Sequence, residues 1–101
     1  MVLSGRVCAR PQIRYSPAGI PIARFTLEHE SDQVEAQRPR RARLRIGVVA
    51  AGEALQHGLH GVTEATALRV AGFLANAGYR AGDCRLVLHA QRIELLNEHE
   101  H

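Results

Sequence analysis

Hydrophobic and polar residues alternate with a period of two in the first third of the chain. In residues 2–10 the odd positions carry apolar or small side chains, and the even positions after Val2 carry serine, arginine and cysteine. In residues 23–28, Phe25 and Leu27 alternate with polar residues. Residues 16–19, Ser-Pro-Ala-Gly, form a turn signal between the two runs. This pattern predicts two strands of an antiparallel hairpin.

A third alternating run extends over about residues 40–50. Its hydrophobic residues share one face of the predicted strand, and three arginines share the other. The hydrophobic residues are Leu44, Ile46 and Val48, and the arginines are Arg41, Arg43 and Arg45. Residues two positions apart on a strand lie about 7 Å apart on the same face. We therefore expect the hydrophobic residues to enter the core and the three arginines to line an outward surface.

The rest of the chain supplies two more strands, one short helix and the connections between them. The expected segments are loops at about 30–39 and 75–84, a helix within 52–61, strands at 67–74 and 85–96, and a polar tail at 97–101. The alternation in the last strand breaks at Gln91 and Arg92, which predicts a bulge or burial on both faces.

Five strands with a helix between the third and fourth are typical of an OB-fold, a small Greek-key barrel. A five-stranded sandwich is the competing all-β arrangement. The chain has 101 residues, which predicts one domain spanning residues 1–101. With 46% hydrophobic but only 4% aromatic residues, the core must consist mainly of valine, leucine, isoleucine and alanine.

All thirteen basic residues are arginines, and five of them fall within residues 38–45. The net charge is +3 and the isoelectric point is about 9.5. Arginine has a planar, permanently charged head suited to phosphates and to stacking on bases. The run therefore indicates a polyanionic partner, with nucleic acid as the first candidate, whereas the simplest alternative is a solvated face of a basic protein.

Other chemistries find little support in the sequence. Cys8 and Cys84 belong to no Cys-x-x-Cys pair, and no signal peptide or long apolar run is present, so we expect a cytoplasmic protein with reduced thiols and no membrane association. His57 and His60 form a His-x-x-His pair without further ligands, so no metal is expected. No catalytic constellation is present, and we expect neither an enzyme nor a cofactor.

Five segments of the chain form a recognisable combination: Val2-Leu-Ser-Gly-Arg-Val-Cys8, Ser16-Pro-Ala-Gly-Ile-Pro21, Phe25-Thr-Leu-Glu-His29, Val70-Ala-Gly-Phe73 and Leu86-Val-Leu-His-Ala90. Together they resemble the PriB family, primosomal replication protein N, which is related to bacterial single-stranded DNA-binding protein. These segments follow one another in the same order as in the family, and the resemblance covers nearly the whole chain. It implies an OB-fold homodimer without catalytic activity that binds single-stranded DNA. It also implies a role in replication restart, where the dimer bridges DNA and the primosomal helicase among other primosome proteins.

The resemblance and the arginine run together predict the residues that contact nucleic acid. They are Arg38, Arg40, Arg41, Arg43 and Arg45 in the third strand and its approach, and Tyr79, Arg80 and Arg85 around the tip between the last two strands. The family has an aromatic pair where this chain has Arg38 and Arg43. Because stacking on aromatic rings stabilises bound single strands, this substitution predicts a more electrostatic, more salt-sensitive interface.

Two alternatives stay open at this point. The basic face could dock an acidic protein, making the chain an interaction scaffold with incidental DNA binding. A general single-strand binder is disfavoured, because such proteins carry a long acidic tail, whereas only the short segment 97–101 follows the last expected strand.

Overall fold

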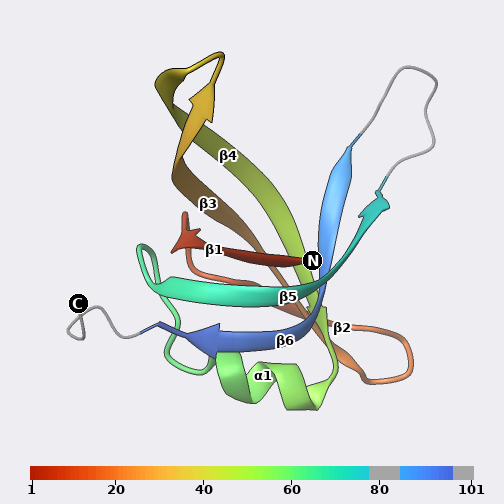
Figure 1. The fold of residues 1–101 in the computed structure, drawn as a ribbon. Helices are drawn as coiled ribbons and strands as arrows, with labels where there is room; N and C mark the ends of the chain where they lie inside the picture. Colours follow the sequence, from red (N-terminus) through yellow and green to blue (C-terminus); the bar gives the residue numbers. More distant parts are fainter. Residues whose placement is uncertain (78–84, 97–101) are drawn as a thin grey trace.

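A computed structural model describes residues 1–77 and 85–96, and within these residues the chain forms six strands and one helix (Figure 1). The elements are β1 (Val2–Val7), β2 (Gln12–Tyr15), β3 (Pro21–Glu35), β4 (Arg38–Ala51), α1 (Glu53–Leu59), β5 (Ala67–Asn76) and β6 (Leu86–Leu95). The short strand β2 is an addition to the five predicted strands.

Five of the strands close into a barrel, which confirms the predicted OB-fold. The strands are paired in the order β1-β5-β6-β4-β3, and the pairing of β1 with β3 closes the ring. All of these pairs are antiparallel except β4 with β6. Both β1 and β2 pair with the same edge of β3, at Leu27–Glu28 and at Pro21–Arg24 respectively. Pro11 lies between these two strands and cannot donate a ladder hydrogen bond, which accounts for the interruption.

The strands β3 and β4 form a long hairpin whose outer half projects beyond the barrel (Figure 1). We call its outer part, from Glu28 to Arg45, the arm. The two strands pair from Ile22↔Ala51 to Glu35↔Arg38 around a turn of two residues, Ala36 and Gln37, with φ of 49° and 65°. The prediction of a loop over residues 30–39 is therefore wrong. Cross-strand pairing stabilises these polar residues as strands, and the turn lacks the Asn-Gly pair that usually marks such a hairpin.

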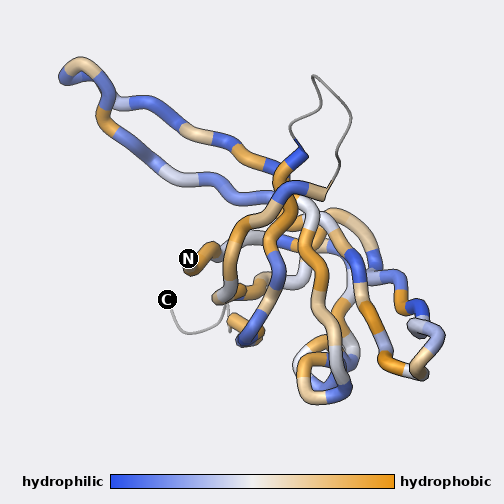
Figure 2. Tube along the Cα trace, turned by 90° about the vertical axis from the view of Figure 1, so that its right-hand side faces the viewer, coloured by the Kyte–Doolittle hydropathy of each residue, from blue (hydrophilic) through white to orange (hydrophobic). Residues whose placement is uncertain are grey.

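The core lies inside the barrel and consists of aliphatic residues and one phenylalanine. Its buried members are Leu3, Val7, Ala23, Phe25, Leu27, Ile46, Val48, Ala50, Leu59, Val62, Leu68, Val70 and Leu88. Ile46 and Val48 enter the core as predicted, but Leu44 is 41% exposed. The prediction for Leu44 fails because β4 has left the barrel at this position and no second layer covers the arm. Figure 2 shows this contrast between a hydrophobic barrel and a largely hydrophilic arm.

The hairpin of β5 and β6 contains the predicted irregularity. Ala71 pairs with Arg92 while Gly72 pairs with Ala90, so Gln91 is the extra residue of a bulge. At Gly72 the two backbones approach so closely that a Cβ atom would collide with the carbonyl oxygen of His89. The strand β5 continues to Asn76, so residues 75 and 76 of the predicted loop are strand, and the loop residues 78–84 and the tail 97–101 lie outside the described residues.

The predicted helix is confirmed between β4 and β5, where it packs beneath β6 at one end of the barrel (Figure 1). Leu59 is buried in the core, and Leu55 packs against it. The helix ends at Leu59; the following residue, His60, is extended, and Gly61 has φ of 79°. No helix in the described part of the chain is long and apolar enough to cross a membrane.

Candidate nucleic-acid interface

The three alternating arginines of β4 lie on one outward face of the arm, as the sequence predicts. The side chains of Arg41, Arg43 and Arg45 are 69%, 72% and 72% exposed. Each is nevertheless ion-paired with a glutamate of β3. Arg45 Nε lies 2.8 Å from Glu28 Oε2, Arg43 Nη2 2.7 Å from Glu30 Oε1, and Arg41 Nη2 3.2 Å from Glu30 Oε2.

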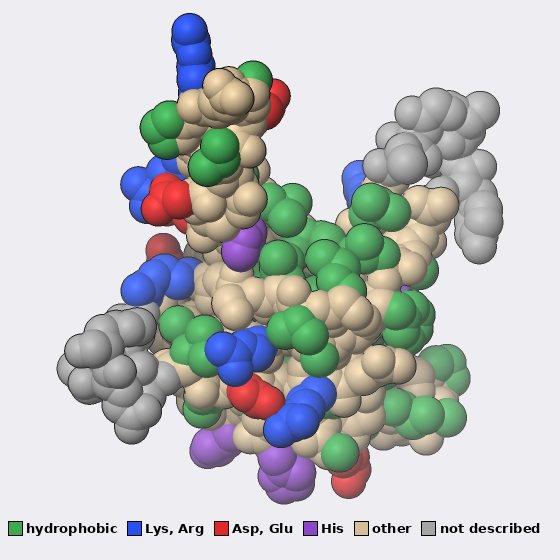
Figure 3. All heavy atoms as spheres, viewed as in Figure 1, with side chains coloured by type: hydrophobic (Ala, Val, Ile, Leu, Met, Phe, Trp, Pro, Cys, Tyr) green, Lys and Arg blue, Asp and Glu red, His purple; other side chains and the backbone are tan. Residues whose placement is uncertain are grey.

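The ion pairs follow from the register of the hairpin. Glu28 lies opposite Arg45 and Glu30 lies opposite Arg43, so the acidic positions of β3 share a face with the basic positions of β4. The hydrogen bond and charge of Arg43 lower the pKa of Glu30, and the same contact raises the pKa of Arg43. Figure 3 shows acidic atoms beside basic ones along the arm. The arm therefore presents partly neutralised arginines rather than an uncompensated cationic stripe.

Arg38 and Arg40 lie near the tip of the arm, on the face opposite to that of Arg41. The strand alternation separates them, because even and odd positions of β4 point to opposite sides. Arg40 forms an ion pair of 3.3 Å with Glu35, and Arg38 lies opposite Glu35 in the ladder. The structure thus distributes the five-arginine run over two faces.

A second group of arginines surrounds a groove of about 690 Å³ at the root of the hairpin. We call it the basic groove. Its lining residues are Ala9, Arg10, Gln12, Arg24, Phe25, Thr26, Gly47, Val48, Val49, Asn76, Ala77, Arg85, Val87 and His89. They come from β2, β3, β4, β5 and β6 and from the segments that flank them. The three arginines, Arg10, Arg24 and Arg85, are exposed.

The floor of the basic groove is built from outward-facing residues with small side chains. Thr26 of β3 lies opposite Gly47 of β4, and Gly47 lies in register with Val87 of β6. Gly47 has no side chain, and a Cβ built there would meet only Val87 Cγ2, at 4.0 Å. The centre of the floor is therefore open to a ligand.

The electrostatics of the basic groove differ from those of the arm. None of its described lining residues is acidic. None of the ion pairs between described residues involves Arg10, Arg24 or Arg85. Within the described part of the chain, three arginine charges therefore converge on this groove without a carboxylate to compensate them, which suits a ligand that carries several negative charges.

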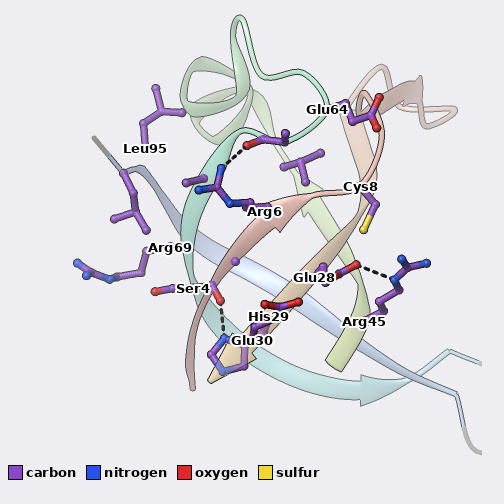
Figure 4. A pocket seen from close by; sticks show the side chains of 15 residues that line it. Ser4, Arg6, Cys8, Glu28, His29, Glu30, Arg45, Glu64, Arg69 and Leu95 are labelled. Atoms are coloured by element: carbon purple, nitrogen blue, oxygen red, sulfur yellow. Dashed lines mark hydrogen bonds and ion pairs between the residues drawn. The ribbon is translucent and has the colours of Figure 1, made fainter. Parts of the chain in front are cut away.

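The structure also contains a larger cavity, of about 930 Å³, beside β1 (Figure 4). Acidic and basic residues line it together, and several of the basic ones are already engaged. Arg6 Nη1 donates to the Ala65 carbonyl oxygen at 3.0 Å, and Arg45 is paired with Glu28. His29 Nδ1 donates to the Ser4 carbonyl oxygen at 2.6 Å. A polyanion would meet carboxylates here, so the smaller basic groove is the better candidate.

Of the predicted site residues, the described structure brings only Arg85 to the basic groove. Arg38, Arg40, Arg41, Arg43 and Arg45 lie on the arm, and Tyr79 and Arg80 lie outside the described residues. Sequence reasoning missed Arg10 and Arg24. Arg24 alternates with the core residues Ala23 and Phe25, which indicates an outward side chain, but nothing local indicates that it faces Arg85 across three strands.

Comparison with known proteins gives consistent results. The model of a family described as "Another single-strand binding protein family" matches residues 1–92. A replication restart protein PriB of Photorhabdus laumondii is 46% identical over 97 residues, which cover 96% of this chain and 92% of that protein. The replication restart protein PriB of Proteus mirabilis is 41% identical with the same coverage.

Solved structures agree with these sequence matches. A PriB structure from Ralstonia solanacearum has a TM-score of 0.76 and 29% identity, and the match covers 96% of both chains. Single-stranded DNA binding protein from Thermus aquaticus has a TM-score of 0.78 at 22% identity, covering 96% of this chain and 49% of that one, and shares the fold. With its five-stranded barrel and these sequence matches over nearly its whole length, the chain belongs to the PriB family of single-strand binding proteins.

Proposed function

We propose that this protein binds single-stranded DNA as an accessory protein of the replication-restart primosome. In this proposal it acts in the cytoplasm, without catalysis, as a homodimer that bridges DNA and the primosomal helicase. The observation that carries the DNA-binding part is the basic groove, where Arg10, Arg24 and Arg85 converge without an acidic neighbour among the described lining residues. The names of the PriB relatives support the link to replication restart.

The position of the basic groove fits the way barrels of this fold bind oligonucleotides. OB-folds bind single strands on the outer face of their second and third strands, between flanking loops. Those strands are β3 and β4 here, and the groove lies on their outer face beside the beginning of β6. The arginines would hold phosphates, while the open floor at Gly47 would allow the chain of nucleotides to approach the sheet.

The arm would extend the binding path beyond the groove. Arg45 lies two residues before Gly47 on the same face of β4, and Arg41 and Arg43 continue in that direction. Phosphates must compete there with Glu28 and Glu30, so we expect the arm to contribute less than the groove. The remaining predicted residues stay proposed contacts: Arg38 and Arg40 near the arm tip, and Tyr79 and Arg80 beside Arg85.

Fluorescence anisotropy with a labelled dT oligonucleotide, titrated at several salt concentrations, tests the proposal. Three neutralised phosphates give a slope of log K against log[salt] of about −2 for a single strand. The variant R10A/R24A/R85A should lose most of this slope, whereas R41A/R43A/R45A, matched in charge, should lose less. A wild-type affinity that does not change with salt, or tighter binding to duplex DNA than to single strands, would contradict the proposal.

The homodimer part of the proposal is supported by the exposed start of β1. This strand pairs with β5 along Val2–Arg6 but with β3 only at Arg6 and Val7, so one backbone edge at residues 2–5 has no strand partner within the described chain. Met1 and Val2 are 53% and 61% exposed, and hydrophobic side chains gather on this face at the root of the arm (Figure 3).

Light scattering tests the homodimer and should give twice the 11.1 kDa chain mass. A mass of 11.1 kDa at micromolar concentration would exclude the dimer.

The ion-paired arm favours one second candidate, a protein-interaction scaffold. Its alternating glutamates and arginines suit a partner with complementary mixed charges better than a uniform polyanion. The anisotropy titration separates the two candidates. No oligonucleotide binding at low salt, together with retained binding to a primosomal protein, would select the scaffold.

A further inference from the structure

A row of four outward-facing residues crosses the sheet beside the floor of the basic groove. Arg24 of β3 lies opposite Val49 of β4, Val49 lies in register with His89 of β6, and His89 lies opposite Phe73 of β5. His89 and Phe73 are stacked, with ring centroids 5.1 Å apart and an angle of 14° between the ring planes. The groove therefore has a guanidinium on one side and a supported imidazole on the other.

The stacking of Phe73 on His89 determines which face of the His89 ring is available to a ligand. Because β6 lies between β5 and β4 in the sheet, Phe73 covers the face of His89 that is directed toward β5. The other face is directed toward β4 and the groove, which His89 lines. Gly72 brings the backbone of β5 into close approach with that of His89, which helps to hold the two rings together.

His89 and Arg24 stand on the two sides of β4. The two residues stand on strands that are two sheet spacings apart, about 9–10 Å. Between them lies Val49, with Gly47 next to it on the same face of β4. The other ring among the described lining residues of the groove, that of Phe25, is 6% exposed and belongs to the core. The imidazole of His89 is thus the ring that a bound base would meet.

We propose that His89, backed by Phe73, is a stacking site for one nucleobase of a strand whose phosphates are held by the arginines of the basic groove. This inference rests on the proposed DNA-binding function and specifies how a base is held. Stacking of a base on an aromatic side chain contributes about 1–3 kcal/mol, independently of sequence and largely independently of salt. His89 therefore adds a non-electrostatic component to an interface that is otherwise dominated by arginine.

Titration of a labelled dT oligonucleotide with aromatic variants tests the site. H89A should weaken binding at least about fivefold, with an unchanged salt slope, since about 1 kcal/mol is the lower limit for one stacked base. H89F and H89Y should keep affinities near that of the wild type, and F73A should weaken binding less than H89A. Y15A is the matched control, because Tyr15 is a 72% exposed aromatic residue outside the groove. Thermal melting of each variant confirms that it is folded.

An abasic oligonucleotide of the same length separates stacking from any indirect effect on the arginines. Wild type and H89A should bind this probe equally, because the base that His89 contacts is missing. Equal dT affinities of wild type and H89A, or an equal loss on both probes, would overturn the stacking site while leaving the proposed function intact. If the wild type itself fails to bind dT at low salt, the proposed function and with it the stacking site are wrong.

Discussion

At the scale of single residues, two glycines on the barrel wall serve different purposes. At Gly72, a Cβ would collide with the carbonyl oxygen of His89 in the neighbouring strand, so the bulged β5–β6 pairing requires the absence of a side chain. At Gly47, a Cβ would have ordinary contact with Val87 and would point into the basic groove. The first glycine is required by the fold, and the second leaves room for a ligand.

This difference predicts opposite effects of the same substitution. G72A should destabilise the protein by about 1–3 kcal/mol or more, because backbone must move to relieve the collision. G47A should leave stability unchanged or raise it by up to about 1 kcal/mol, because it reduces the entropy of the unfolded chain, yet it should weaken DNA binding by filling the floor. Urea denaturation measures the stabilities, and anisotropy the affinities. Equal stability losses for the two variants would show that the close approach at Gly72 is not what limits substitution.

At the scale of elements, the arm is a hairpin whose charges face each other in pairs. Glu30 bridges Arg41 and Arg43, at 3.2 and 2.7 Å. Glu94 on β6 likewise bridges two arginines, Arg69 at 3.6 Å and Arg92 at 2.9 Å, but it does not line the basic groove. Exposed ion pairs of this kind add little stability, and their main effect is to occupy arginines that a ligand could use.

The two glutamates provide a matched pair of variants for the arm. E30Q should raise the affinity for single-stranded DNA several-fold at low salt and steepen the salt slope by about 0.7–1.4, because one or two arginines become available for phosphates. E94Q makes the same change in net charge and also releases two arginines, yet it should have little effect. If both variants raise affinity equally, overall charge rather than the arm is responsible; if E30Q has no effect, the arm does not contact DNA.

At the scale of the whole molecule, the barrel and the arm differ in how they are stabilised. Leu88 of β6 is fully buried beside Val48 of the parallel-paired β4, inside the ring of strands. Leu44 has the same parity on β4 as Val48 but lies on the arm, where it is 41% exposed. Cooperative stability should therefore come from the closed barrel and not from the length of its longest hairpin.

Leucine-to-alanine substitutions measure this difference. L88A should lower the free energy of unfolding by about 2–5 kcal/mol, because it removes buried methyl groups and leaves a cavity. L44A should cost less than about 1 kcal/mol, as expected for a surface position. Both values follow from urea unfolding curves. A comparable loss for L44A would mean that something covers the arm in solution, such as a second copy of the chain.

The sequence predicted those features that depend on neighbouring residues along the chain. Strand alternation placed Arg41, Arg43 and Arg45 on one face, and the break at Gln91 predicted the bulge. It failed over residues 30–39, where polar composition suggested a loop although every residue outside the two-residue turn at 36–37 has a partner across the hairpin. The failure has the same origin as the misplacement of Leu44, since composition does not show whether a strand has left the core.

By itself the sequence determined which side of β1, β3 and β4 is outward within the barrel, where the helix lies between β4 and β5, and that an arginine-rich chain of this family suits a polyanion. Only the tertiary structure decided which outward residues meet. Glu28 and Glu30 occupy the arm arginines because of the hairpin register. Arg10, Arg24 and Arg85 converge because barrel closure brings distant strands together. Alternation is a local property of a strand, whereas the contents of a groove depend on long-range pairing that no short stretch of sequence specifies.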